Sequence, residues 1–226
     1  TLTLSGNNTY TGATTISAGT LEVGSAGRLG AGNYAGNISN NGTLIYSGTN
    51  NQTLSAIISG SGALTQNAAS TLTLSGNNTY SGSTTINAGT LAVSGNISSS
   101  ALTINSGGVV SAGSTAAVAK FNAASLTVAG DSGYAFTIGN ISGGTAGTAG
   151  TDYDQIATSG AITFNNTAAN PFTVYINGTP TNWSSSGSYT WNILSGSSLS
   201  GFSSGNFVAD YSSFGGALAS GASWTF

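Results

Sequence analysis

The sequence lacks cysteine, methionine and histidine and has very few charged residues. Only two of the 226 residues are Lys or Arg and five are Asp or Glu, so 3% are charged, against about 25% in average globular domains. Without cysteine and histidine, disulfides, thiol nucleophiles, Ser-His-Asp triads and the usual zinc sites are excluded. The two isolated cations, Arg28 and Lys120, cannot form the basic cluster that phosphate binding needs, so we expect no nucleic-acid partner.

Long hydrophobic runs are absent as well. No run approaches the about 18 apolar residues that a membrane helix needs, so we expect no membrane insertion of this segment. No basic region followed by an apolar stretch opens the sequence, which predicts no signal peptide in this numbering, and a start at Thr1 suggests processing from a longer precursor. The scarcity of oxidisable side chains and tryptic sites suits an extracellular, protease-containing environment, with biased low-complexity composition as the alternative.

What the sequence contains is a repeated segment. Residues 71–93, TLTLSGNNTYSGSTTINAGTLAV, match residues 1–23 at 19 of 23 positions, and the differences leave every large apolar residue unchanged. Leucine alternates with threonine at the start of the segment, and Leu91 and Val93 alternate with small residues at its end, which predicts β-strands with one buried face. The stretches SGNNTYSG and NAG, the latter at 87–89, predict turns.

This pattern resembles the passenger-associated repeat, also called the autotransporter-associated β-strand repeat, of secreted and surface bacterial proteins. The motif TLTLSGNNTYxGxTTIxAGTLxV carries the resemblance over residues 1–23 and 71–93, and looser copies extend over the rest of the first 130 residues. The resemblance implies a right-handed parallel β-solenoid, or β-helix, displayed outside the cell. The family pattern carries no catalytic residues.

Strand patterns continue along the chain and predict an all-β fold with two regions. Leucine-centred patterns recur about 20–35 residues apart, as expected for stacked coils. We predict a β-solenoid over residues 1–130 and an aromatic-rich C-terminal β region over 131–226, either continued solenoid or a β-sandwich-like cap. A glycine-rich loop is predicted at 143–151. Further strands are predicted at 161–164, 172–176, 189–193 and 222–226.

Asparagine at the predicted turns has a structural interpretation. In stacked coils, equivalent asparagines can form ladders of amide hydrogen bonds along the axis. We therefore interpret Asn7, Asn8, Asn77 and Asn78 as structural residues rather than binding residues.

Asp152 and Asp154 are the only closely spaced carboxylates. On a strand, residues two apart point to the same side, at a separation that suits an inverting glycosidase. Such sites need further charged groups, which this sequence lacks. We predict instead a site for calcium or another hard cation, with a turn whose aspartates accept backbone N–H bonds as the alternative. No cofactor other than calcium is expected.

The tryptophans suggest a carbohydrate contact. Trp183 lies between a proline-containing turn and three serines, and an exposed ring there could stack on a glycan. Trp191 and Trp224 lie in alternating patterns and are interpreted as core residues.

Both ends of the chain are predicted to associate with other copies. Repeat sequence begins at once with Thr1, Leu2, Thr3 and Leu4, and the last predicted strand includes Trp224, Thr225 and Phe226. Open β edges pair readily with another chain, and head-to-tail contacts that do not close build filaments. We predict a non-enzymatic, self-associating structural protein, extracellular or on the cell surface, or a fragment of a longer passenger. The alternatives are an adhesin passenger that binds glycans or surfaces and a polysaccharide-active β-helix enzyme.

Overall fold

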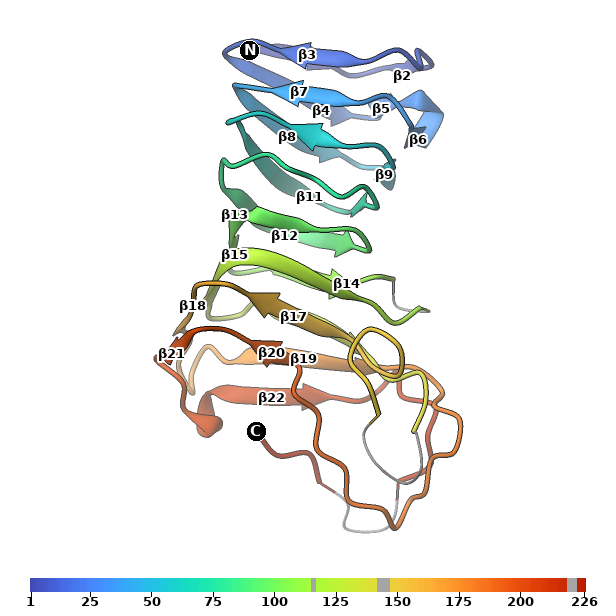
Figure 1. Cartoon of the computed structure of the whole chain (residues 1–226), viewed down its shortest axis with the longest axis vertical. Coiled ribbons are helices and arrows are strands. Elements are labelled where there is room, and N and C mark those ends of the chain that lie inside the picture. Colours follow the sequence, from blue (N-terminus) through green and yellow to red (C-terminus); the bar gives the residue numbers. More distant parts are fainter. Residues whose placement is uncertain (115–116, 142–146, 219–222) are drawn as a thin grey trace.

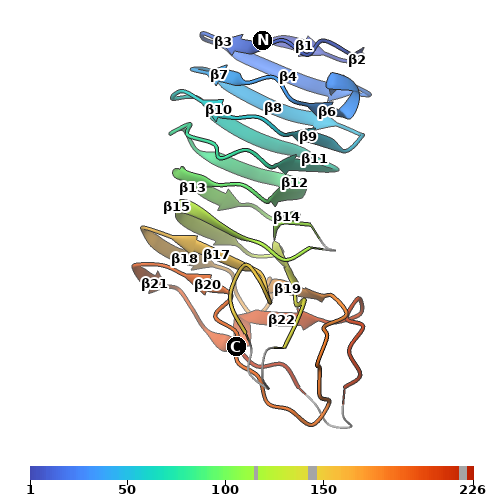
Figure 2. The same ribbon diagram turned by 45° about the vertical axis from the view of Figure 1, so that its right-hand side comes forward.

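The computed structural model describes residues 1–114, 117–141, 147–218 and 223–226. These residues form an all-β stack of coils, with the N-terminus at one end and the C-terminus near the other (Figures 1 and 2). Helical structure within them is confined to two short 3-10 turns, η1 (Gly30–Gly32) and η2 (Ser204–Asn206). None of their helices is long and apolar enough to cross a membrane.

Each coil passes through up to three sides of the stack, and strands on one side pair in parallel with those of the next coil. The first side contains β1 (Leu2–Leu4), β4 (Thr20–Ser25), β8 (Thr43–Gly48), the first parts of β11 (Ala63–Leu74) and β12 (Thr84–Val93), most of β13 (Ile97–Ile104) and β15 (Lys120–Ala129), then β18 (Ala161–Asn165) and β21 (Ser198–Ser200). The second side contains β6 (Asn33–Tyr34), β9 (Gln52–Leu54), the second parts of β11 and β12, β14 (Gly108–Ala112), β16 (Gly133–Thr137), β19 (Phe172–Asn177) and β22 (Phe207–Asp210).

The third side is less regular. It contains β3 (Thr14–Ile16), β7 (Ile38–Asn40), β10 (Ile58–Ser59), the first residues of β13 and β15, then β17 (Gln155–Thr158) and β20 (Leu194–Ser195). The short strands β2 (Asn7–Asn8) and β5 (Arg28–Leu29) form a separate pair at a corner. All these ladders are parallel, which gives the arrangement of a β-solenoid.

Coil length nearly doubles toward the C-terminal end. Leu44 pairs with Leu64, 20 residues on, whereas Leu126 pairs with Ile162, 36 residues on. The extra residues lie between β16 and β17 and between β19 and β20. An isolated parallel bridge between Asn140 and Thr181 shows that these long connections also stack on each other.

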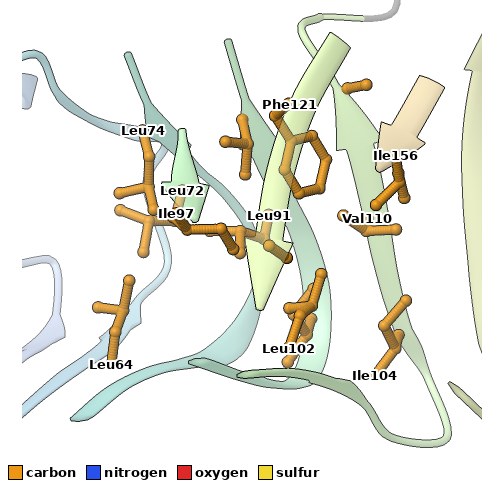
Figure 3. Packing of buried hydrophobic residues seen from close by; sticks show 14 of the residues in the cluster. Leu64, Leu72, Leu74, Leu91, Ile97, Leu102, Ile104, Val110, Phe121 and Ile156 are labelled. Carbon is orange, nitrogen blue, oxygen red and sulfur yellow. The ribbon is translucent and has the colours of Figure 1, made fainter. Parts of the chain in front are cut away.

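Aliphatic side chains fill the interior because alternate residues point inward in strands such as β8 and β9. Buried leucines such as Leu64, Leu72, Leu91 and Leu102 line this interior (Figure 3). Leu21, Leu44 and Leu64 lie one above another in successive coils and form a column on the first side, and Leu72 and Leu91 do so on the second side. Full burial of a leucine stabilises a fold by about 1.5–3 kcal/mol relative to exposure, so these columns supply much of the stability of the stack.

The two copies of the repeat lie on different sides of this stack. Leu2 pairs with Leu21 on the first side, and the equivalent Leu72 pairs with Leu91 on the second. Both pairs are 19 residues apart, so the repeat preserves the length of one coil. The sides of the solenoid therefore accept the same strand sequence.

Asparagine ladders run along the exterior, as predicted. The Asn96 amide donates to Asn77 Oδ1 at 3.0 Å, and the Asn122 amide donates to Asn96 Oδ1 at 2.8 Å. A second ladder joins Asn67, Asn87 and Asn105. These bonds confirm a structural role for Asn77.

Several predicted strands and turns differ from the structure. The predictions at 161–164 and 172–176 are confirmed, but residues 189–193 and the described part of 222–226 form no strand. Burial does alternate through 189–193, as the sequence pattern predicted, and at the end of this segment the Ile193 carbonyl accepts the Ile156 N–H of β17 at 3.0 Å. The turn predicted at 87–89 is also wrong, because β12 continues through it with Gly89 at φ +65°.

The boundary at residue 130 stays a prediction. Parallel pairing continues across it, since β15 pairs with both β17 and β18. Of the glycine-rich loop predicted at 143–151, residues 143–146 lie outside the described residues. Gly147 and Gly150, with φ of +81° and +82°, support a turn in the remainder.

Candidate functional site

Asp152 and Asp154 lie just before β17 (Gln155–Thr158) and have separate hydrogen-bond partners. The Asp154 carboxylate accepts the backbone N–H of Ala119 at 2.7 Å and that of Thr137 at 2.8 Å, one on each oxygen. The Asp152 carboxylate accepts the Asn140 amide at 2.9 Å and the Thr148 backbone N–H at 2.7 Å. These are the bonds of the alternative prediction, in which the aspartates hold the surrounding backbone.

The surroundings of Asp154 change its acidity. Burial raises the pKa of this carboxyl to about 7, against the lowering effect of the hydrogen bonds from Ala119 and Thr137. Burial of the Tyr134 side chain, together with the negative charge of Asp154, raises the pKa of the Tyr134 phenol well above its ordinary value. Asp154 therefore titrates near neutral pH inside the fold.

The geometry does not support the strand argument for a carboxylate pair. Asp152 lies in a turn and Asp154 outside any strand, so the spacing expected for two residues on one face of a strand does not apply. Within the described residues, no group of three or more Asp, Glu, His or Cys gathers around a possible metal position. Calcium binding by Asp152 and Asp154 stays a prediction.

Trp183 belongs to an aromatic cluster on the outer connections of the wide coils. Its indole N–H donates to the Ala217 carbonyl at 2.7 Å. Its ring lies 4.9 Å from that of Tyr189, 5.0 Å from that of Phe214 and 6.4 Å from that of Trp191. Neighbouring rings thus contact much of the Trp183 ring.

The cluster also includes one end of the chain. Trp224 stacks on Trp191 at 5.8 Å, and Phe226 contacts Phe207 at 5.4 Å. Trp191 and Trp224 are partly buried against the core, which agrees with their interpretation as packing residues. The predicted glycan-binding residue Trp183 and the predicted self-association residue Trp224 therefore both contact the ring of Trp191.

An open cavity of about 1120 Å³ lies at the C-terminal end of the stack. Its inner wall includes Phe164 and Ile176 from the last paired coils, and its outer wall includes Trp191, Trp224 and Phe226. No charged residue lines it within the part of the chain that the structure describes. Any ligand or segment that enters it would meet aromatic rings, aliphatic groups and hydroxyls.

At the opposite end, the first coil has one face that no other coil of the described residues covers. Leu2 is 61% exposed and Tyr10 is 39% exposed. Their equivalents in the second copy of the repeat, Leu72 and Tyr80, are 0% exposed. Identical sequence is therefore covered in the middle of the stack and open at its end.

The remaining residues predicted for self-association also lie at the two ends. Thr1, Thr3 and Thr225 are exposed and Leu4 is partly buried. Sequence reasoning missed Tyr10, at the open first coil, and Leu199 and Phe202, which are 56% and 46% exposed in the last coil. The alternation of Ser198, Leu199 and Ser200 is the sequence pattern that could have identified Leu199.

Comparison with known proteins agrees with the repeated segment. The family model described as the passenger-associated-transport-repeat matches residues 1–23 and 64–93. Residues 1–23 and 64–93 are therefore similar to this passenger repeat. The two matched segments contain the first coil and the central strands β11 and β12, which pair in parallel with each other. Neither the curated proteins nor the solved structures include a significant match to the chain.

Passenger repeats of this family imply secreted or surface-exposed proteins. The matched residues contribute strands, turns and columns, and among them lie none of the buried aspartates or clustered tryptophans. The family match therefore supports the scaffold and leaves the ends and the aromatic cluster to be interpreted from their geometry.

Proposed function

We propose that this chain is a non-enzymatic structural protein, extracellular or on the cell surface, whose copies associate head to tail through open β edges into a fibre or surface layer. The coils are proposed to wind in the right-handed sense, as the family resemblance implies. The observation that carries the proposal is the contrast between Leu2, exposed in the first coil, and Leu72, buried at the same repeat position.

The open first coil supports this association physically. Its strand β1 pairs with β4 on one edge and has no neighbouring strand among the described residues on the other. Unpaired N–H and C=O groups of such an edge bind a further strand. Residues 1–19 contain no charged side chain, so a second chain can approach without repulsion between like charges.

Electron microscopy and sedimentation velocity of the purified chain test the proposal. We expect elongated assemblies whose sedimentation coefficient rises with concentration, and a shift toward single chains in Leu2→Asp. Ile57 supplies a matched control, because it is 43% exposed on the lateral surface, and Ile57→Asp should assemble as the parent does. Single chains at every concentration would overturn the proposal.

A second candidate function is an adhesin passenger that binds glycans or other surfaces. The uncharged aromatic cavity favours it, because sugar rings stack on aromatic faces. A glycan array with the parent and Trp183→Ala tests this candidate, with circular dichroism to show that the variant is folded. A bound neutral glycan whose signal survives in Trp183→Ala would place the binding surface elsewhere.

Calcium binding and glycan cleavage at Asp152 and Asp154 are tested separately. Calorimetric titration of calcium into the parent and into Asp152→Asn should reveal a difference if these carboxylates bind the ion. Loss of a glycan-cleaving activity in Asp152→Asn would support the enzyme alternative, and absence of activity in the parent would end it.

A further inference from the structure

Five successive coils carry one short pattern on the outer face of the first side. Each copy has Ala or Ser in first position, Thr in third position and Asn or Ala in fifth position. The copies are ALTQN at 63–67, STTIN at 83–87, ALTIN at 101–105, SLTVA at 125–129 and AITFN at 161–165. The second and fourth residues of every copy are buried and none of the others is, so the first, third and fifth residues point outward.

The threonines of the five copies form one unbroken row along the axis of the stack. The printed register pairs each of them directly with the next. The row consists of Thr65, Thr85, Thr103, Thr127 and Thr163. Parallel strands lie about 4.8 Å apart, so a hydroxyl and a methyl group recur at that interval. Because threonine has a restricted χ1, neighbouring members of the row favour the same orientation.

Most hydroxyls of this row have no partner in the chain. Among the described residues, those of Thr65, Thr85, Thr103 and Thr127 make no hydrogen bond. By contrast, the inward-facing Thr84 bonds two other hydroxyls. The hydroxyls of the row are therefore available to a partner outside the chain.

The residues on either side of the row keep this face even and uncharged. On one side lie only alanines and serines, which do not project above threonine. On the other side the Asn87 amide donates to Asn67 Oδ1 at 3.2 Å, and the Asn105 amide donates to Asn87 Oδ1 at 2.7 Å. Such side-chain ladders stabilise sheets of low twist. None of the outward residues of the five copies is charged.

The second side of the same coils has no comparable row. Its outward residues include one register of mixed size and chemistry, which runs through Thr73, Ala92, Ser111, Ala135 and Tyr175. The preference of threonine for strands would favour it on both sides. Strand propensity therefore does not explain why the regular row is confined to the first side.

We infer that this threonine face, the outward residues of the five copies, binds the surface of ice. The interval of about 4.8 Å along the row is close to the repeat between equivalent oxygens in the ice lattice. The free hydroxyls can bond lattice water, and the methyl groups lie between them. The face is complementary to ice in charge, because a neutral lattice cannot compensate a charge that loses its hydration. The inference involves neither end of the chain and does not depend on head-to-tail association.

Inhibition of ice recrystallisation by the purified chain tests this inference. Thr103 lies in the middle of the row, where a tyrosine ring would project above the face and hold the lattice away. We expect Thr103→Tyr to raise the concentration needed for inhibition by about tenfold or more. Thr73→Tyr is the matched control, because it places the same ring on the outer face of the second side and should change that concentration by less than about twofold. Circular dichroism shows whether both variants are folded.

Each other outcome contradicts the inference. Absence of inhibition by the parent, or exclusion of the labelled parent from slowly growing ice, would overturn it. Equal activity in Thr103→Tyr, or equal loss in both variants, would overturn the assignment to the threonine face. Binding of the parent to microcrystalline cellulose without an effect on ice would assign the row to a polysaccharide and also overturn it. Sedimentation of the parent reports head-to-tail association separately, so failure of either proposal is distinguishable from failure of the other.

Discussion

The hydroxyl of Tyr80 lies 2.6 Å from that of Thr84, inside the solenoid and out of contact with water. Thr84 also lies 2.7 Å from the Ser100 hydroxyl in the next coil, so three buried hydroxyls form one chain. Burial raises the pKa of Tyr80 to about 12, which keeps the phenol protonated as a donor. Polar groups within the core are thus used to join neighbouring coils.

We expect Tyr80→Phe to destabilise the fold by about 1–2 kcal/mol, because Thr84 loses a buried hydrogen-bond partner. Tyr134 is the matched control: it is also buried, but its hydroxyl has no hydrogen-bond partner among the described residues. Removing an unpaired buried hydroxyl should leave stability unchanged or raise it by about 1 kcal/mol. Urea unfolding of both variants measures the difference, and equal losses would contradict it.

The leucine columns predict a difference between identical repeat positions. Leu72→Ala should lower the free energy of unfolding by about 2–5 kcal/mol, because it leaves a cavity in the filled interior. Leu2→Ala should change the stability of the dissociated chain by less than about 0.5 kcal/mol, because its side chain is mostly exposed. Chemical denaturation at low protein concentration measures the free energy of unfolding of both variants. A comparable loss at Leu2 would mean that the first coil is covered in the single chain.

The asparagine ladders should contribute modestly to stability. Asn96 bonds both Asn77 and Asn122, so Asn96→Ala should cost about 1–2 kcal/mol. Asn7 is equivalent to Asn77 in the repeat but lies in the uncovered coil, where its side chain is exposed. Asn7→Ala should therefore have little effect, and thermal unfolding of the two variants provides the comparison. An unchanged thermal stability in Asn96→Ala would contradict a stabilising role for the ladder.

The raised pKa of Asp154 predicts that the free energy of unfolding falls as pH rises. Its pKa is about 7 when folded and near 3.8 when unfolded, so between these values the folded chain binds more protons. The stabilisation is complete below about pH 4 and is lost progressively toward pH 7, with a slope of up to about 1.4 kcal/mol per pH unit. Asp154→Asn should remove this slope. The free energy of unfolding measured at several pH values checks both chains, and a parent whose stability does not change with pH would contradict the prediction.

Much of the regular part of the fold could be predicted from the sequence. The alternation around Leu72 and Leu91 predicts burial of one face of these strands, and the stretch SGNNTYSG at 75–82 predicts the break after β11. Parallel stacking followed from the resemblance of the repeat, because alternation alone does not distinguish a parallel coil from an antiparallel hairpin.

The widened coils and the environment of Asp154 could not be predicted in this way. Tyr189 and Trp191 alternate as strand residues do, but they form no strand and instead pack in an aromatic cluster. Asp154 accepts N–H groups from Ala119 and Thr137, which lie 35 and 17 residues away. Contacts of this range depend on how the connections fold over the stack, and local patterns do not record them.

The placement of the two repeat copies on different sides bears on how such a rod can change length. A segment that fits the first side at Leu2 and the second side at Leu72 does not need to return to its starting angle. Insertions or deletions of a single strand and corner would rotate everything downstream by one side while keeping the apolar columns filled. Growth of the rod in evolution is thus not restricted to whole turns.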